Sequence, residues 1–372
     1  MGVFVDIRNV LFGALYRGVI KPLLFLRDPE DVHDGAVTLG KLFGRFALTR
    51  ALTRVCFGYS HPMLSQTIHG VGFLNPVGLA AGFDKDGHLV EVLGALGFGA
   101  EEVGSVTGEA CAGNPRPRLW RLPHTQALGV YYGLKNDGAE VVAARIARAK
   151  KSTTIGISVA KTNSPGTASD DAGIADYTKA FRAALPVADF ITINISCPNA
   201  YGGEPFHDSM RLAKLLSRMP LADARQPLFI KVSPDLSTGE LDALLDVIKK
   251  HPIAGIVVGN LTKNREALNI DPRDTVPEKG GISGIPTKEK ALALVRHARR
   301  AMPKEFTIIG CGGIMSADDA YAYIRAGASL VQLITGMIFE GPQLISDINR
   351  GLVRRLKRDG FPHLSDAVGT PS

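Results

Sequence analysis

The sequence predicts an α/β protein, a (βα)8 TIM barrel with an N-terminal helical extension. From residue 77 onward, eight short apolar runs alternate with helical patterns, which is the order of a parallel barrel. An open, doubly wound sheet is the alternative, but no GxGxxG motif follows the first run. Hydrophobic residues make up 45% and charged residues 21% of the 372 residues, a balance that excludes a disordered chain.

The apolar runs have the length of strands and are rich in Val and Ile, as expected for strands buried on both faces. Helical patterns follow most of them. The clearest begins with Ser237-Thr238-Gly239-Glu240, a capping box, and the last begins after Pro342. The predicted strands are Val77–Ala81, Ala100–Val106, Thr154–Val159, Phe190–Ile195, Leu228–Val232, Gly255–Val258, Thr307–Gly310 and Leu330–Leu333.

Residues 1–55 are predicted to form the amphipathic extension, residues 56–366 the barrel, and residues 367–372 a frayed tail. Asp28-Pro29-Glu30-Asp31 predicts a helix start inside the extension, with Asp28 as the N-cap. The two helices on either side of it can lie on a membrane surface or pack as a cap on their own domain, and both readings stay open. Their apolar stripes are Val10, Leu11, Ala14, Leu15, Gly18 and Val19, and Val32, Leu39, Leu42, Phe43 and Phe46.

The composition also restricts the partners. The formal charge is +7, but the basic residues are scattered and accompany no nucleic-acid motif, so we expect no nucleic acid partner. Four cysteines without a CxxC spacing predict neither a disulfide scaffold nor a metal site, and they favour a reducing compartment. No segment has the pattern of a membrane-spanning helix or a signal peptide.

In a barrel of this kind, the site lies at the carboxyl ends of the strands. Gly310-Cys311-Gly312-Gly313 after the seventh strand and Thr335-Gly336 after the eighth let backbone N–H groups approach a phosphate. Lys85 and Lys231 stand at strand ends, where each suits an anionic ring or carboxylate. A lysine that only extends its charged end to solvent is the alternative for both.

Three amides occur at the same strand ends. Asn194, Asn199 and Asn260 suit a flat heterocycle with alternating N–H and C=O groups. Cys197 lies between two of them and is the best candidate for proton transfer, since a thiol with a pKa near ~8.5 supplies some thiolate at neutral pH. A buried, inert cysteine is the alternative. Cys311, beside the glycine turn, is interpreted as a packing residue.

These strand ends resemble the dihydroorotate dehydrogenases, FMN-dependent (βα)8 barrels of pyrimidine biosynthesis, over nearly the whole chain. The extension, with Asp28-Pro29-Glu30 and His33, is similar to that of the membrane-associated class 2, whose helices cap the barrel and form a tunnel for quinone. The resemblance implies a peripheral protein on the cytoplasmic face of the inner membrane. The segments that carry it are Asn75–Gly87, Gly113–Pro123, Ile193–Asn199, Ile230–Ser237, Gly280–Pro286 and Gly327–Gly336.

The resemblance also implies the roles of individual residues. Cys197 would remove the C5 proton of dihydroorotate while a hydride passes from C6 to the flavin, and Lys231 would stabilise the reduced ring. Quinone would then reoxidise the flavin. The residues implied in substrate binding are Lys85, Asn194, Asn199 and Asn260. Those implied in FMN binding are Ala81, Lys85, Ser105, Asn194, Lys231, Gly284, Gly312, Gly313, Thr335 and Gly336.

The chain departs from the family pattern inside this site. Class 2 enzymes have Ser as the base, whereas Cys197 is the choice of the soluble class 1. The ring-binding Asn of the family is Val130 here, Thr-Asn-Thr at strand six is Gly259-Asn260-Leu261, and an FMN-side Asn at strand three is Ser158. Two alternatives to dihydroorotate oxidation therefore stay open. One is a paralogous FMN oxidoreductase for another cyclic amide or ene compound, and the other is a flavin-binding paralogue without catalysis.

Overall fold

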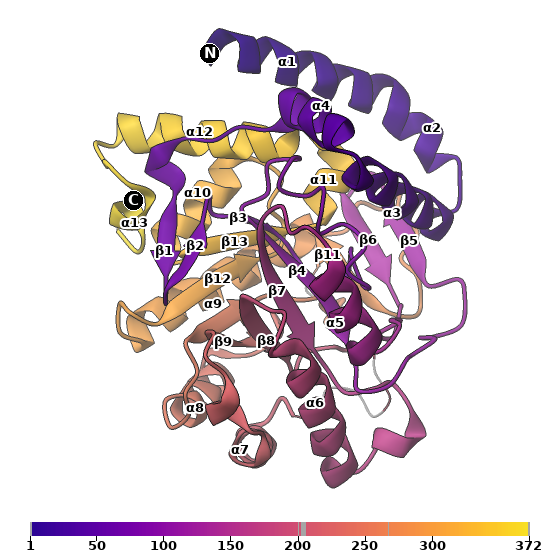
Figure 1. Ribbon diagram of the computed structural model, residues 1–372, viewed down its shortest axis with the longest axis vertical. Coiled ribbons are helices and arrows are strands. Elements are labelled where there is room, and N and C mark those ends of the chain that lie inside the picture. Colours follow the sequence, from indigo (N-terminus) through magenta and orange to yellow (C-terminus); the bar gives the residue numbers. More distant parts are fainter. Residues whose placement is uncertain (1, 200, 202–205, 267, 371–372) are drawn as a thin grey trace.

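The computed structural model describes residues 2–199, 201, 206–266 and 268–370. At its centre, eight parallel strands form a closed barrel, in which β13 pairs with β3 to complete the ring (Figure 1). The predicted barrel is therefore confirmed. In the order of the ring, its strands are β3 (Val77–Leu79), β4 (Ala100–Val106), β7 (Thr154–Val159), β8 (Phe190–Asn194), β9 (Leu228–Val232), β10 (Gly255–Val258), β12 (Thr307–Cys311) and β13 (Leu330–Leu333).

All eight predicted strands are present, and the differences are confined to their ends. The first strand ends two residues early at Leu79, the fourth ends one residue early at Asn194, and the seventh runs one residue further to Cys311. At the fourth strand the reason is local. The Ser196 N–H donates to the side-chain oxygen of Asn194 (3.2 Å), so the chain turns out of the strand ladder into the site loop.

Helices surround the barrel (Figure 1). The predicted capping box is confirmed, since the side chains of Ser237 and Glu240 each accept from the backbone N–H of the other. Residues 80–99, after the first strand, form turns rather than a helix. The helices that surround the barrel are α5 (Ala139–Arg148), α6 (Asp170–Ala184), α7 (Ser209–Arg218), α8 (Thr238–Ile248), α9 (Lys288–Ala301), α10 (Ala317–Ala326), α11 (Thr335–Glu340), α12 (Leu344–Arg358) and α13 (Leu364–Ala367).

The two ends of the barrel differ in chemistry. At the amino end, a hairpin of β1 and β2 brings Phe73 onto the strands, where its ring lies 6.2 Å from that of Phe190. Phe229 packs edge-on against Phe190 at 5.7 Å, so aromatic side chains fill this end. The carboxyl end carries a second, antiparallel sheet of β5, β6 and β11. The short strands are β1 (Gln66–Ile68), β2 (Val71–Phe73), β5 (Leu119–Leu122), β6 (Ala127–Val130) and β11 (Gly281–Gly284).

The helical extension is present and runs along one edge of the molecule (Figure 1). The predicted helix N-cap at Asp28 is confirmed, because the Asp28 carboxylate accepts from the N–H groups of Glu30 (2.8 Å) and Asp31 (3.1 Å). The extended backbone of Phe46 then separates a further helix that the sequence patterns did not distinguish. The extension consists of α1 (Gly2–Leu15), a π-helical turn η1 (Tyr16–Ile20), α2 (Lys21–Phe25), α3 (Pro29–Arg45) and α4 (Ala47–Phe57).

The buried face of α1 carries Val5 but is held to the barrel by polar side chains. Arg8 donates to the Ser346 hydroxyl (2.7 Å) of α12, and Asn9 donates to the Asp347 carboxylate (2.7 Å). Most of the large apolar side chains of the extension are exposed. No helix in the described part of the chain combines the length and apolarity that crossing a bilayer requires. The exposed large apolar side chains of the extension are Phe4, Ile7, Val10, Leu11, Leu15, Val19, Ile20, Leu23, Leu26, Leu39, Leu42, Phe43, Phe46, Leu48, Leu52 and Val55.

The end of the chain differs from the predicted frayed tail as far as Thr370. Ala367 is fully buried, and the Gly369 N–H donates to the Ile324 carbonyl (3.0 Å) of α10. Arg325 Nε donates to the Thr370 carbonyl (3.0 Å). These bonds attach the segment to α10. Residues 371–372, which complete the predicted tail, lie outside the described residues.

Candidate active site

A network of hydroxyl and amide groups lies where β4, β7 and β8 end. The Ser105 and Ser158 hydroxyls are 2.7 Å apart, and Asn194 Nδ2 donates to Ser105 Oγ (2.8 Å). Asn260, which follows β10, donates to both the carbonyl and the hydroxyl of Ser196 (2.8 Å each) and lies 3.5 Å from Asn194 Oδ1. The fold thus brings three predicted site residues, Ser105, Asn194 and Asn260, together.

A pocket lies beside this network, between the barrel strands and the glycine turns. Lys231 and Asn260 line it, and so does Ser283 of β11, whose hydroxyl is 2.9 Å from Thr335 Oγ1. Gly312 and Gly313 have positive φ values of 131° and 63°, which a glycine turn adopts without strain. The predicted cofactor residues that line this pocket are Ala81, Lys231, Gly284, Gly312, Gly313, Thr335 and Gly336.

The barrel interior next to the pocket is polar. Gln332 lines the pocket and donates a hydrogen bond to the buried Glu102 carboxylate. One oxygen of Glu102 and the side-chain oxygen of Gln332 have no hydrogen-bond partner among the described residues. Cys311, interpreted above as a packing residue, is the last residue of β12 and also lines the pocket. Burial raises the pKa of its thiol.

Cys197 and Asn199 lie in the loop after β8. Asn199 Nδ2 donates to the Val130 carbonyl (2.8 Å) at the end of β6, and its Oδ1 is buried without a described partner. Val130 therefore contributes its backbone at the position where the family has a side-chain amide. Lys161 lies close enough to Cys197 for their charges to interact, so a thiolate at Cys197 has a cation nearby.

Lys85, predicted to contact both substrate and cofactor, lies where the barrel meets the extension. Its Nζ is 3.3 Å from His33 Nε2 of α3 and 4.0 Å from the centre of the Tyr132 ring. Burial, together with the charge of Lys135, lowers the pKa of Lys85 to about 8. Among the described residues, no carboxylate lies within ion-pair distance of Lys85 Nζ.

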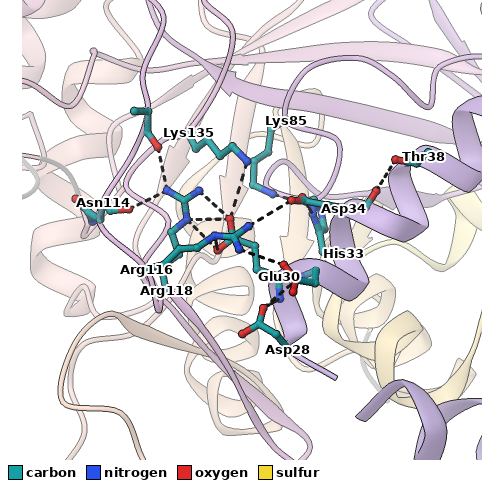
Figure 2. Close-up of polar contacts among 12 residues, drawn as sticks. Asp28, Glu30, His33, Asp34, Thr38, Lys85, Asn114, Arg116, Arg118 and Lys135 are labelled. Atoms are coloured by element: carbon teal, nitrogen blue, oxygen red, sulfur yellow. Dashed lines mark hydrogen bonds and ion pairs between the residues drawn. The ribbon is translucent and has the colours of Figure 1, made fainter. Parts of the chain in front are cut away.

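An ion-pair network holds the start of α3 at this junction (Figure 2). Glu30 is only 3% exposed and accepts from Arg118 Nε (3.0 Å) and Nη2 (2.7 Å). Arg116 and Lys135 lie 3.1 and 3.9 Å from the same carboxylate. Burial alone would raise the pKa of Glu30, but the hydrogen bonds and charge of Arg118 outweigh burial, so the net shift is downward.

Several site residues are missing from the sequence predictions. Gln332 is the single polar residue in the buried run Leu330–Leu333, and that contrast was an available signal. Ser196 stands directly before Cys197, at a strand end, and was equally available. Tyr132 gave no signal, because its contact with Lys85 joins segments far apart in the sequence.

Three potential metal ligands converge outside the pocket. Asp86, His88 and Asp137 bring ligand atoms within 4.8 Å of one another. Both carboxylates already have partners, since Arg145 donates to Asp137 (2.7 Å) and the Asp137 N–H donates to Asp86 (2.7 Å). The expectation that the protein binds no metal stays a prediction.

The arrangement of barrel, extension and pocket has counterparts in known proteins. The model of the family "Dihydroorotate dehydrogenase" matches residues 63–356. Relatives named dihydroorotate dehydrogenase (quinone) occur in Gloeobacter violaceus, at 39% identity over 358 residues (95% of this chain and 98% of the relative), and in Natronomonas pharaonis, at 40% over 358 residues (96% and 99%).

Solved structures agree with these relatives. Two crystal structures of DHODH from Eimeria tenella, one in complex with ferulenol and one ligand-free, match this chain with a TM-score of 0.80 and 28% identity. Each match covers 92% of this chain, and 95% and 99% of those chains. Because the relatives match the extension as well as the barrel, this chain belongs to the dihydroorotate dehydrogenase family, in its quinone-dependent class.

Proposed function

We propose that this protein oxidises dihydroorotate to orotate with bound FMN and transfers the electrons to a quinone, a step of pyrimidine biosynthesis. The observation that carries the proposal is the convergence of Asn194, Asn260 and Lys231 at one end of the barrel, beside a pocket closed by glycine turns. The full-length similarity to relatives named dihydroorotate dehydrogenase (quinone) supports the same activity.

The donors of the pocket fit FMN. Gly312, Gly313 and Gly336 offer backbone N–H groups to a phosphate, and Thr335 offers a hydroxyl. Lys231 is 3% exposed and lines the same pocket, so its cation is available to an electron-rich ring. FMN, when bound, supplies the hydride acceptor of the reaction.

The chain's own residues bind the substrate and move its proton. Cys197 acts as the base that removes the C5 proton, and the cation of Lys161 stabilises its thiolate. The buried Asn199 Oδ1, which has no hydrogen-bond partner among the described residues, accepts from a ring N–H of the substrate, which satisfies an otherwise costly acceptor. Asn260 orients the other ring groups, and the Lys85 ammonium binds the anionic substrate.

The extension docks on a membrane with its apolar face. A helix that packs only on its own protein turns apolar residues inward, whereas α1 bonds to α12 through Arg8 and Asn9 and exposes Leu11 and Leu15. Such a surface suits the interface of a bilayer, where quinone is dissolved. We therefore infer that the protein is peripheral to a membrane; the cytoplasmic face of the inner membrane is what its resemblance to class 2 implies.

Anaerobic addition of dihydroorotate to the purified protein tests the function. We expect the visible absorption of the bound flavin to bleach, and a soluble quinone added afterwards to restore it. Addition of orotate, the product, is the control and leaves the flavin oxidised. A flavin that dihydroorotate does not bleach would contradict the proposed substrate while leaving the fold assignment intact.

A second function, oxidation of another cyclic amide or ene compound, is favoured by one observation. Val130 supplies only its carbonyl to Asn199, so one ring-binding amide of the family is missing. If this alternative holds, Val130→Asn will gain turnover of dihydroorotate. If the wild type already bleaches with dihydroorotate and Val130→Asn brings no gain, the alternative is contradicted.

A further inference from the structure

The extension reaches the substrate side of the site through two contacts. His33 of α3 lies 3.3 Å from Lys85 Nζ, across 52 residues of sequence. The partner of Glu30 on the barrel, Arg118, donates to the Asn114 carbonyl (2.8 Å), and the Asn114 amide donates to the Asn199 carbonyl (3.1 Å). Two residues proposed to bind the substrate are therefore connected to one helix of the extension.

The surroundings of Lys85 make His33 its main polar partner. The Tyr132 ring attracts the ammonium from one side, and the Tyr132 hydroxyl is buried without a described partner. The His33 ring is in turn held by Phe83, whose ring centre is 5.0 Å away in an edge-on arrangement. A long lysine side chain with no carboxylate beside it depends on such contacts for a fixed position.

The proton on the His33 ring decides which contact it makes. Nδ1 lies 3.1 Å from Asp34 Oδ1, and Nε2 lies 2.8 Å from the Phe83 carbonyl as well as near Lys85. With its proton on Nε2, the ring donates to the Phe83 carbonyl, two residues before Lys85. With its proton on Nδ1, the ring donates to Asp34, and Nε2 can accept from the Lys85 ammonium. Either tautomer ties His33 to the segment that carries Lys85. Two cations 3.3 Å apart would repel, so a charged Lys85 needs a neutral His33.

The Glu30–Arg118 ion pair fixes His33 in this place. Glu30 and His33 are three residues apart on α3 and share one face of the helix. Both ion-pair partners are buried, and the contact is bidentate, which restricts rotation of the helix at this point. Figure 2 shows Glu30, His33 and Lys85 gathered at the start of α3.

We propose that His33 is a positioning residue of the substrate site, which holds the Lys85 ammonium in place for the anionic substrate. The extension then contributes to dihydroorotate binding as well as to membrane and quinone contact. This inference rests on the proposed function and adds to it a role for a side chain outside the barrel.

The test compares two substitutions of similar bulk. His33→Gln keeps a polar group that can accept near the Nε2 position, whereas His33→Leu removes it. Orotate binding is followed through the visible absorption of the bound flavin, a readout that needs neither turnover nor quinone. We expect His33→Leu to weaken orotate binding about tenfold and His33→Gln to stay within about threefold of wild type, as for loss of one charge-assisted hydrogen bond. Leu39→Ala, on the same helix but exposed, is the control and binds orotate normally.

The reductive half-reaction separates the outcomes. Under anaerobic conditions, His33→Leu needs more dihydroorotate for half-maximal flavin bleaching, while the limiting rate changes less. If His33→Leu binds orotate like wild type and loses only quinone reduction, the inference is wrong and His33 serves the quinone side alone. If His33→Leu loses its flavin, His33→Asn is used instead, because it keeps a polar group only near the Nδ1 position. We then expect His33→Asn to weaken orotate binding about tenfold. If dihydroorotate does not bleach the flavin of the wild-type protein, the proposed function itself is wrong.

Discussion

Raising the pH from 7 to 9 will weaken orotate binding, because Lys85 loses its charge in this range. Burial lowers the pKa of Lys85 from the ordinary value of 10.5 to about 8, so the ammonium is present below pH 8 and is lost above it. The charged fraction falls from about 90% at pH 7 to about 10% at pH 9, which reduces the affinity for an anion about tenfold. The titratable groups that face Lys85 are His33, Tyr132, Asp34, Glu30, Asp86 and Lys135.

The assay is an orotate titration followed by flavin absorption at each pH. The Lys85→Arg variant shows how much of the pH dependence comes from Lys85, because a guanidinium stays charged throughout this range. Any pH dependence that remains in this variant comes from another titrating group or from the ligand. Burial and the charge of Lys85 lower the pKa of His33, so His33 stays neutral above pH 7 and contributes no slope. The reasoning is refuted if affinity is flat from pH 7 to 9, or if Lys85→Arg keeps the wild-type slope.

Three further predictions follow from other parts of the molecule. Cys197→Ala will keep the flavin and lose most of its bleaching by dihydroorotate; an unchanged rate would remove Cys197 from the role of base. Leu11→Asp will reduce cosedimentation with anionic vesicles and leave bleaching intact. Met210→Asp, at a still more exposed position on α7, a helix far from the extension in Figure 1, will change neither. Arg118→Gln will lower the free energy of unfolding by about 2–3 kcal/mol in urea, because it leaves a buried carboxylate with weaker partners. The half-exposed Arg116→Gln will cost less than about 1 kcal/mol, and equal losses in both variants would contradict this account.

The barrel was predictable because parallel strands buried on both faces are continuous apolar runs, and such runs are visible without tertiary information. Leu228–Val232 and Gly255–Val258 match the predicted bounds to the residue. The ends were less predictable, since a side-chain bond such as Asn194 to Ser196 decides where a strand stops. The direction of the apolar stripe on α1 was also beyond the sequence, because an amphipathic pattern does not say whether its apolar face meets protein or membrane.

For the site, the sequence predicted that the polar residues at the strand ends lie at the same end of the barrel. It did not predict which of these side chains bond to one another. That Asn194 bonds Ser105 follows from the ring order of β4, β7 and β8, which a periodic pattern alone does not supply. At the substitution that looked most damaging from the sequence, the structure shows only a backbone contact, the Val130 carbonyl bonded to Asn199, and this contact does not replace the missing side-chain amide. Backbone groups belong to every residue, so no pattern of side chains predicts such a contact.

The position of α3 decides how the extension must be tested. Deleting residues up to about Thr53 would remove the exposed apolar side chains of the extension, among them Leu39 and Leu42. We therefore expect the deletion to weaken vesicle binding and quinone reduction. The same deletion would take Glu30 from the buried Arg118 and His33 from Lys85, and so disturb the substrate side as well. A truncated protein that binds orotate poorly would then say nothing about the membrane. Point substitutions on the outward face, at Leu39 or Leu42, separate the two roles, because these side chains are exposed and leave Glu30 and His33 in place.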